Sequence, residues 1–382
     1  MSVTAAQGFE AGAVSAGLKA SGGLDFTIVA NRGPRQAAAA VFTSNRAKAN
    51  PIIWSQQVIA DGEVAAIVLN SGGANCFTGA QGFQVTHATA EAVAEALDVS
   101  AGDVLVCSTG LIGDQLPLEK MLAGVVAAAA DLGDHGVAAS EAIMTTDSRP
   151  KRALREGTGC VIGGMAKGAG MLAPGLATML VVVTTDADLS SSDLDTALRA
   201  ATRVSFDRLD SDGCMSTNDQ VSLLASGASG VVPDRAEFTA LLTSLCEDLA
   251  EQLQGDAEGA SHDIRIEVVG AASEADAVEV GRSVARNNLF KAAVFGNDPN
   301  WGRVLAAIGT TSATFDPYDV DVSMNGVRVC HAGAPDRPRS EVDLTPRRVD
   351  VLIDLRSGDS AATILTNDLT HDYVHENSAY SS

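Results

Sequence analysis

The sequence places a threonine where a glycine-rich segment meets a strongly apolar run. Residues 163–183 read GGMAKGAGMLAPGLATMLVVV, so Thr178 follows small residues and precedes a strand-sized apolar stretch. Such a threonine can attack the preceding carbonyl, and hydrolysis of the resulting ester cuts the Ala177–Thr178 bond. The new chain then begins with a hydroxyl nucleophile and a free α-amine, whose ordinary pKa of about 7.7–8.0 suits a general base. Locally, the pattern is also typical of an ordinary loop entering a strand.

Other patterns with chemical potential are less specific. Lys167 precedes the glycines of KGAG and a strand follows, whereas a phosphate-binding loop needs Lys followed by Ser or Thr and a helix. His371 and His375 are spaced to share a helix face, but the H-E-x-x-H order of a zinc site is absent, so they are better interpreted as surface histidines on a C-terminal helix. No G-x-G-x-x-G follows a strand and no G-x-S-x-G is present. These patterns predict neither a metal site nor a nucleotide-binding loop.

The composition argues against several classes of protein. The chain has 382 residues and a formal net charge of −22, which disfavours nucleic-acid binding. The beginning of the chain lacks a signal-peptide pattern, and no apolar run approaches the roughly 20 residues of a membrane span. The six cysteines are scattered without a C-x-x-C pair, which favours reduced core cysteines over disulfides. We therefore expect a cytoplasmic protein that binds neither membrane nor nucleic acid.

The elements that must position Thr178 alternate between short strands and helices, which indicates an α+β fold. Strands are predicted at 24–30, 39–43, 64–70, 104–108, 142–145, 160–165, 179–185, 263–269, 292–295, 320–324 and 349–355. Helices are predicted at 88–97, 118–132, 235–254 and 273–286, with a further helix starting at the capping cluster 190–193. Apolar residues make up 46% of the chain and aromatic residues 4%, so the core must consist mainly of aliphatic side chains.

Longer motifs resemble the ornithine acetyltransferase (glutamate N-acetyltransferase) family of arginine biosynthesis nearly from end to end. The matching segments are GFEAGAVSAGLK, VFTSNRAKANP, NSGGANCFTG, CSTGLIGDQLP, AIMTTDSRPK, MAKGAGMLAPGLATML, DGCMSTND, DAEGA, LFKAAVFGNDPNWGRVLAAIG and LTNDLTHDYVHENSAYSS. The threonine junction and GNDPNWGR are each specific, and the shared order strengthens the assignment. The chain departs from the family at GANCFTG, at DSDGCM before STND, and at its final Ser381-Ser382, where others commonly end in Arg-Thr.

The resemblance implies a proenzyme with a layered sandwich of mixed sheets and helices around an N-terminal-nucleophile site. Self-cleavage would leave an α chain of residues 1–177 and a β chain of residues 178–382. Two copies of each are expected to assemble as a heterotetramer. Thr178 would take the acetyl group from N2-acetylornithine and pass it to L-glutamate in a ping-pong reaction that requires no metal or organic cofactor.

The resemblance also implies the roles of individual residues. Thr109 and Gly110 match the oxyanion hole. Besides Thr178 itself, the positions that match substrate-binding residues are Lys167, Glu258, Asn377, Ser382 and a threonine of the Thr145–Thr146 pair, of which we take Thr146. An ammonium such as that of Lys167 suits a substrate carboxylate, and a carboxylate such as that of Glu258 suits the ornithine amine.

Two other functions remain open from the sequence. A self-processing N-terminal-nucleophile aminopeptidase or amidase would use water as acceptor, although the Lys167 and Glu258 matches argue against it. A catalytically silent, uncleaved binding or scaffold protein would migrate as one intact chain on a denaturing gel. Within the acetyltransferase class, the sequence leaves open whether acetyl-CoA also serves as donor, as it does in bifunctional members.

Overall fold

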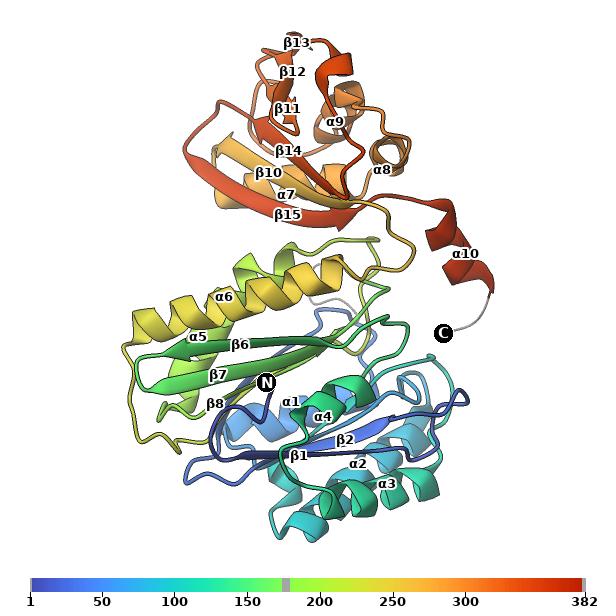
Figure 1. The fold of residues 1–382 in the computed structure, drawn as a ribbon, viewed down its shortest axis with the longest axis vertical. Coiled ribbons are helices and arrows are strands. Elements are labelled where there is room, and N and C mark those ends of the chain that lie inside the picture. Colours follow the sequence, from blue (N-terminus) through green and yellow to red (C-terminus); the bar gives the residue numbers. More distant parts are fainter. Residues whose placement is uncertain (1, 174–178, 380–382) are drawn as a thin grey trace.

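Three β-sheets and the helices that cover them make up the protein (Figure 1). The structure is a computed structural model and describes residues 2–173 and 179–379. Two sheets stack face to face in the lower part of the view, and the third belongs to a C-terminal lobe above them. The layered α+β architecture predicted from the sequence is thereby confirmed. The predicted division at Ala177–Thr178 lies outside the described residues.

The first sheet has the strand order β1-β2-β4-β5 and is built from the N-terminal part of the chain. Its strands are β1 (Phe9–Val14), β2 (Phe26–Asn31), β4 (Ala66–Asn70) and β5 (Val104–Ser108). Helices α2 (Gly79–Leu97) and α3 (Leu118–Ala130) cover its outer face, where they share an aliphatic core with the strands. The smaller elements of this region are α1 (Asn50–Val58), η1 (Ile59–Asp61), η2 (Ala101–Asp103) and α4 (Gly136–Ala142).

The second sheet has the order β3-β9-β8-β7-β6 and contains strands from both sides of the Thr178 junction. Its strands are β3 (Ala37–Phe42), β6 (Lys151–Gly157), β7 (Cys160–Lys167), β8 (Leu180–Thr185) and β9 (Gln220–Ala225). Strand β8 pairs antiparallel with β7 and parallel with β9. Helices α5 (Ser191–Val204) and α6 (Arg235–Gln254) cover the outer face, and η3 (Phe206–Arg208) follows α5.

The sequence of β8 explains why it lies between two layers. All six of its residues are buried, so both faces of the strand are covered. Val181 and Val183 pack in the core beneath α5 and α6, whereas Leu180 and Val182 pack in the core between the two sheets. Because successive side chains of a strand point to opposite faces, a continuous apolar run is what a strand buried on both sides requires.

The C-terminal lobe has its own sheet and its own hydrophobic core. The strand order is β13-β12-β11-β14-β10-β15, and helices α7 (Glu274–Ala285), α8 (Asn288–Phe295) and α9 (Trp301–Ile308) contribute to that core. The strands are β10 (Asp263–Ala271), β11 (Asp321–Met324), β12 (Val327–His331), β13 (Ala334–Pro335), β14 (Arg348–Asp354) and β15 (Ser360–Asn367), with η4 (Arg339–Glu341) between β13 and β14. After β15, helix α10 (His371–Ala379) extends back beside the sandwich (Figure 1).

Most predicted elements are confirmed, and two predicted strands are wrong. The strand at 104–108 and the helix at 235–254 have the predicted bounds, and Ser190 caps α5 by accepting from the Asp193 amide. Residues 292–295 are instead the end of α8, which the Asn287 side chain caps, and residues 142–145 comprise the end of α4 and the turn after it. Both segments are four residues long and mostly apolar, AIMT and AAVF, which is too short for periodicity to separate strand from helix.

Two further expectations can be compared with the structure. All six cysteines are free, and five of them are buried, as expected for reduced core cysteines. Across the described ranges, none of the helices combines the length and apolar character needed to span a bilayer.

Candidate active site

One cavity of about 310 Å³ gathers predicted site residues from both halves of the chain. It lies where several elements end: Thr109 follows β5, Lys167 ends β7, and Glu258 follows α6. The predicted residues that line it are Thr109, Gly110, Thr145, Thr146, Lys167, Glu258 and Asn377. Both members of the Thr145–Thr146 pair reach the cavity. Thr178 and Ser382 lie outside the described residues.

The turn after β5 presents Thr109 and Gly110 to the cavity. Thr109 is buried, its amide donates to the Asn70 carbonyl (3.0 Å), and its carbonyl accepts from the Gly73 amide (2.9 Å). Gly110 has a φ of 129°, and a Cβ there would lie 2.9 Å from the Gly73 backbone. Only glycine fits this conformation and this close approach. The backbone therefore holds the turn in one shape.

A buried lysine determines which way the Thr109 hydroxyl donates. Lys167 Nζ lies 3.1 Å from Thr109 Oγ1. An ammonium only donates, so the threonine oxygen accepts this hydrogen bond and its own proton remains free for another acceptor. Thr109 can thus offer a hydrogen-bond donor to the cavity, which is the property an oxyanion hole requires.

The charge of Lys167 is balanced by carboxylates around it. Burial lowers the pKa of Lys167, and the nearby Asp147, Asp219 and Glu258 oppose that effect. Asp147 is the largest of the opposing influences. The net result is a buried ammonium with a pKa below its ordinary value, facing a cavity that has space for a negatively charged group.

Asp147 lies next to the site and connects a second buried lysine, Lys151, to the turn that contains Thr145 and Thr146. Its carboxylate accepts from Lys151 Nζ (2.5 Å), the Gly168 amide (2.6 Å) and the Thr145 amide (3.0 Å). Burial would raise the pKa of Asp147, but the charges of Lys167 and Lys151 outweigh it and hold the pKa below the usual value. Asp147 therefore holds the turn that contains Thr145 and Thr146 close to Gly168, because its carboxylate accepts from both backbone segments.

Glu258 and Asn377 meet on the opposite side of the cavity. Asn377 Nδ2 donates to Glu258 Oε2 (3.0 Å), and the Glu258 amide donates to the Ala169 carbonyl (2.9 Å). A Cβ on Gly170 would lie 2.4 Å from the Glu258 carboxylate, so a larger residue there would displace the Glu258 side chain from this position. The half-buried Glu258 carboxylate thus lies against the segment that follows β7.

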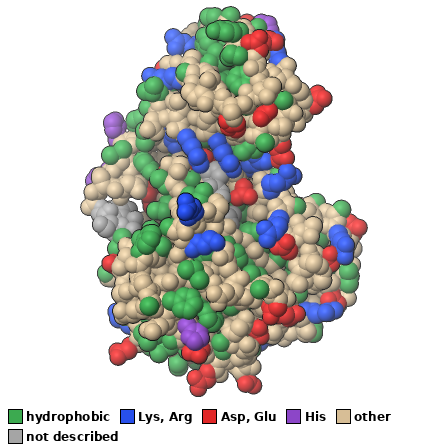
Figure 2. Space-filling model, turned by 180° about the vertical axis from the view of Figure 1, so that it is seen from behind, with side chains coloured by type: hydrophobic (Ala, Val, Ile, Leu, Met, Phe, Trp, Pro, Cys, Tyr) green, Lys and Arg blue, Asp and Glu red, His purple; other side chains and the backbone are tan. Residues whose placement is uncertain are grey.

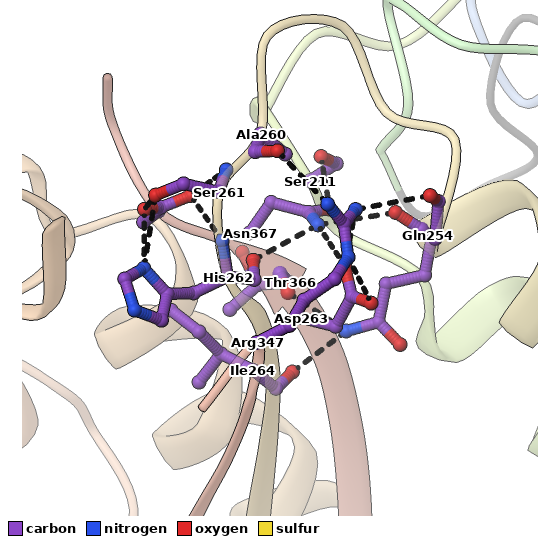
Figure 3. Close-up of polar contacts among 12 residues, drawn as sticks. Ser211, Gln254, Ala260, Ser261, His262, Asp263, Ile264, Arg347, Thr366 and Asn367 are labelled. Atoms are coloured by element: carbon purple, nitrogen blue, oxygen red, sulfur yellow. Dashed lines mark hydrogen bonds and ion pairs between the residues drawn. The ribbon is translucent and has the colours of Figure 1, made fainter. Parts of the chain in front are cut away.

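A polar network anchors the loop that carries Glu258 (Figure 3). Asn367 Nδ2 donates to the carbonyls of Gln254 (3.1 Å) and His262 (3.2 Å), which lie on either side of the loop. Arg347 donates to the carbonyls of Gly255 and Ala260. The loop is therefore tied at both ends to the C-terminal lobe, although Glu258 itself faces the sandwich.

The segment before β9 adds two buried residues that the sequence did not single out. Asn218 lines the cavity and donates to the carbonyls of Ala74 (2.6 Å) and Ser108 (2.8 Å). Asp219 Oδ1 accepts from the amide of Met179 (3.0 Å), the residue after the predicted cleavage site. Burial raises the pKa of Asp219 well above its ordinary value.

The ArgJ family model matches residues 10–382. The chain belongs to the ArgJ family. This confirms the family predicted from the motifs.

Relatives across the ArgJ family cover the whole chain. The chain is 62% identical to the arginine biosynthesis bifunctional protein ArgJ of Streptomyces avermitilis over 383 residues, covering 100% of both. It is 61% identical to the protein of the same name from Streptomyces coelicolor, again over 100% of both. A solved structure of ornithine acetyltransferase complexed with ornithine, from Mycobacterium tuberculosis, is 49% identical with a TM-score of 0.43, covering 47% of this chain and 96% of that one.

A larger cavity elsewhere contains none of the residues matched to the ArgJ site. It measures about 970 Å³ and lies beside α7, where its arginines include Arg203, Arg208 and Arg286. Figure 2 shows Lys and Arg side chains gathered between the C-terminal lobe and the sandwich. Arg203 and Arg208 both pair with Glu274, and Arg286 pairs with Asp210. Because these charges largely compensate one another, we place the reaction in the smaller cavity.

The described part of the chain contains no candidate metal centre. Within it, no group of three or more His, Cys, Asp or Glu side chains is arranged to hold a metal ion. His371 and His375 lie exposed on α10, the C-terminal helix predicted for them, and the His371 ring packs edge-on against Phe295.

Three residues at the site escaped the sequence reasoning: Asp147, Asn218 and Asp219. They lie within segments that were quoted for the family resemblance, but no short motif distinguishes a bracing carboxylate or amide. The one available signal is a run of polar residues, STND, directly before the apolar strand QVSLLA. Such a run needs buried partners if the strand lies in the core.

Proposed function

We propose that the chain cuts itself between Ala177 and Thr178 and then transfers the acetyl group of N2-acetylornithine to L-glutamate through an ester on Thr178. It is an acetyltransferase of arginine biosynthesis, in keeping with its family. The observation that carries the proposal is that one cavity combines an oriented hydroxyl donor, a buried ammonium and the Glu258 carboxylate. Asn218 also lines this cavity, and the adjacent Asp219 accepts from the amide of the residue that follows Thr178.

The proposed maturation uses the same hydroxyl as the later transfer. Thr178 Oγ attacks the Ala177 carbonyl carbon and the peptide C–N bond breaks. The nitrogen keeps its own proton and gains the one lost by the hydroxyl, and so becomes the new α-amine. Water then hydrolyses the ester and releases the Ala177 carboxylate. This leaves Thr178 as an N-terminal residue with a hydroxyl and an amine on adjacent carbons.

In the first half of the transfer, Thr178 Oγ attacks the acetyl carbonyl of N2-acetylornithine and its proton passes to the α-amine. Thr109 and Gly110 donate to the oxygen on which negative charge develops in this proposal. The amide C–N bond then breaks, the proton passes to the departing nitrogen, and ornithine leaves. In the second half, the glutamate amine attacks the ester carbonyl and gives up a proton to the α-amine of Thr178. The ester C–O bond then breaks, that proton passes to Thr178 Oγ, and N-acetylglutamate leaves.

The charged residues of the cavity favour amino acids with charges at both ends. The Lys167 ammonium suits a substrate carboxylate, and the Glu258 carboxylate suits the side-chain ammonium of ornithine. A self-processing aminopeptidase or amidase would not need this pair of charges. The relatives are named bifunctional, which supports testing acetyl-CoA as a second acetyl donor. We also propose that two α and two β chains assemble into a heterotetramer, and that the enzyme acts in the cytoplasm.

Intact mass combined with a donor assay tests this function. The purified protein should contain two fragments, and Edman sequencing of the C-terminal fragment should begin Thr-Met-Leu-Val. N2-acetylornithine with glutamate should give N-acetylglutamate, whereas N2-acetylornithine alone should be hydrolysed slowly if at all. Full-rate hydrolysis without glutamate would favour the amidase. Full-rate transfer by an uncleaved chain would refute the mechanism.

A further inference from the structure

Asn218 and Asp219 connect the two strands that carry the proposed catalytic groups. Asn218 reaches the end of β5, where its side-chain amide donates to the Ser108 carbonyl, and it also donates to Ala74. Asp219 reaches the start of β8 and accepts from the Met179 amide. Both side chains are buried. Consecutive residues thus contact the oxyanion turn and the segment that carries the nucleophile.

We propose that Asn218 and Asp219 form a brace that sets the separation between the oxyanion donors at Thr109–Gly110 and the start of β8. Both are positioning residues for acetyl transfer, and neither exchanges a proton or a bond with the substrate. The proposal rests on the proposed function, because it takes the residue before Met179 as the nucleophile.

The Asn218 arm depends on the chemistry of a primary amide. Its nitrogen donates to two carbonyls, and its oxygen accepts from the Thr217 hydroxyl (2.6 Å). The Ala74 amide in turn donates to the Leu111 carbonyl (2.9 Å), so the two carbonyls held by Asn218 flank the turn containing Thr109 and Gly110. An aspartate of the same shape would direct lone pairs at both carbonyls and lose these contacts.

The Asp219 arm acts together with the residue that follows it. Asp219 accepts from the Met179 amide, and the Gln220 amide donates to the Met179 carbonyl (3.2 Å). Both backbone polar groups of Met179 are therefore held by consecutive residues, Asp219 just before β9 and Gln220 at its start. The Asp219 main chain is itself fixed, because its carbonyl accepts from the Thr43 amide (2.9 Å). The brace thus starts from a rigid part of the sandwich.

Four variants, examined on material shown to be cleaved, test the brace. Asn218→Ala and Asp219→Ala should each lower kcat by about 10- to 100-fold while leaving KM for N2-acetylornithine near its original value, because small displacements of reacting groups impair the reaction more than binding. Asp219→Asn keeps an acceptor oxygen of the same reach for the Met179 amide, and should retain most of kcat. Asn218→Asp should be as impaired as Asn218→Ala.

Two controls separate positioning from general loss of stability. Ser222→Ala removes a buried hydroxyl from β9 that accepts from Gln220 Nε2, and it should leave kcat unchanged even if Tm falls. The double variant Asn218→Ala/Asp219→Ala should lose less than the product of the two single losses, because both arms govern one separation.

The outcomes distinguish failure of the brace from failure of the proposed function. Unchanged kcat in both alanine variants, or a raised KM alone, overturns the brace provided that Thr178→Ala is inactive. An active Thr178→Ala overturns the proposed function itself. If an alanine variant folds with normal circular dichroism but stays uncut, the self-cleavage rate becomes the readout, since the same groups serve that step. Slower cleavage rescued by Asp219→Asn supports the brace, and loss of cleavage in Asp219→Asn as well contradicts it.

Discussion

The Thr109 hydroxyl has its donor direction imposed by the buried Lys167 ammonium, so its proton is available to a developing oxyanion. Thr109→Ala should therefore lower kcat by about 100- to 1000-fold, on the order of 3–4 kcal/mol, with little change in KM. Steady-state kinetics on fully cleaved enzyme are the measurement, because the variant should also slow maturation. A normal kcat with a raised KM would make this turn a substrate contact instead.

The nucleophile itself can be tested by two substitutions of Thr178, one that removes the hydroxyl group and one that keeps it. Thr178→Ala should abolish both self-cleavage and transfer, because one hydroxyl serves both steps. Thr178→Ser keeps the oxygen and the amine and should retain part of each activity. Denaturing gels and a glutamate acetylation assay report the two activities separately. Cleavage of Thr178→Ala would show that another residue is the nucleophile.

On the proposed function, Glu258 should affect binding rather than the chemical step, because its partner is the side-chain ammonium of the donor, whose charge does not change in the reaction. Glu258→Ala should raise KM for N2-acetylornithine by about tenfold, corresponding to a lost charge-assisted hydrogen bond, and leave kcat nearly constant. Glu258→Gln keeps the contact with Asn377 but removes the charge, so it should give a similar KM. A large fall in kcat in both variants would assign Glu258 a role in the reaction itself.

The lowered pKa of Asp147 leads us to expect that the free energy of unfolding depends on pH in the acidic range. Its folded-state pKa is held below the unfolded value of about 3.9, so the ionised carboxylate stabilises the folded state above that pH, and this contribution is lost as pH falls through the folded-state pKa. In an uncleaved Thr178→Ala background, Asp147→Asn should lower the urea midpoint at pH 7, and the difference should shrink below about pH 4. A difference independent of pH would contradict the ion pairing.

Most of the site residues that were predicted from the family motifs line one cavity, although they are far apart in the sequence. Asn218, Asp219 and Asp147 were missed because what distinguishes them is which backbone groups they contact. Those contacts exist only once β5, β8 and β9 are assembled. A sequence shows that a polar residue stands near an apolar strand, but not which amide it will satisfy.

At the scale of elements, regular patterns were predictable and short apolar runs were not. Helix α6 was found with its bounds because its apolar spacing continues over 20 residues and Asp234 caps its start. Helix α8 was interpreted as a strand because its last four residues, AAVF, are all apolar. Strand β6 was missed because KRALREG is an edge strand with several polar side chains, so burial does not impose an apolar run on it.

The loop that carries Glu258 depends on a carboxylate at the end of β15. Asp368 accepts from the amides of Ser261 and His262, both at 3.0 Å. Asp368→Ala would leave these amides without their partner, at a cost of about 1–3 kcal/mol each where they stay buried. We expect a lower Tm and a severalfold higher KM for N2-acetylornithine with kcat little changed. Asp350→Ala, on the exposed face of β14, is the control. An unchanged KM would show that the loop keeps Glu258 in place without Asp368.

At the scale of the whole molecule, the proposed cut divides a sheet without dividing the fold. Strand β7, before the junction, pairs with β8 after it, and β3 pairs with β9. The two fragments should therefore elute together in size-exclusion chromatography under native conditions and separate only in denaturant. Fragments that part in native buffer would mean that the second sheet does not survive cleavage.

The interleaving of strands from both fragments in the second sheet also makes maturation a one-way step in folding. Before the cut, β7 and β8 belong to one chain and find each other by closing a loop, at a rate independent of protein concentration. After the cut, a denatured enzyme must reassemble from two separate molecules, so recovery becomes a bimolecular process that slows on dilution. Persistence of a chain cut as proposed would then depend on slow unfolding, whereas the uncut precursor can return from the unfolded state repeatedly.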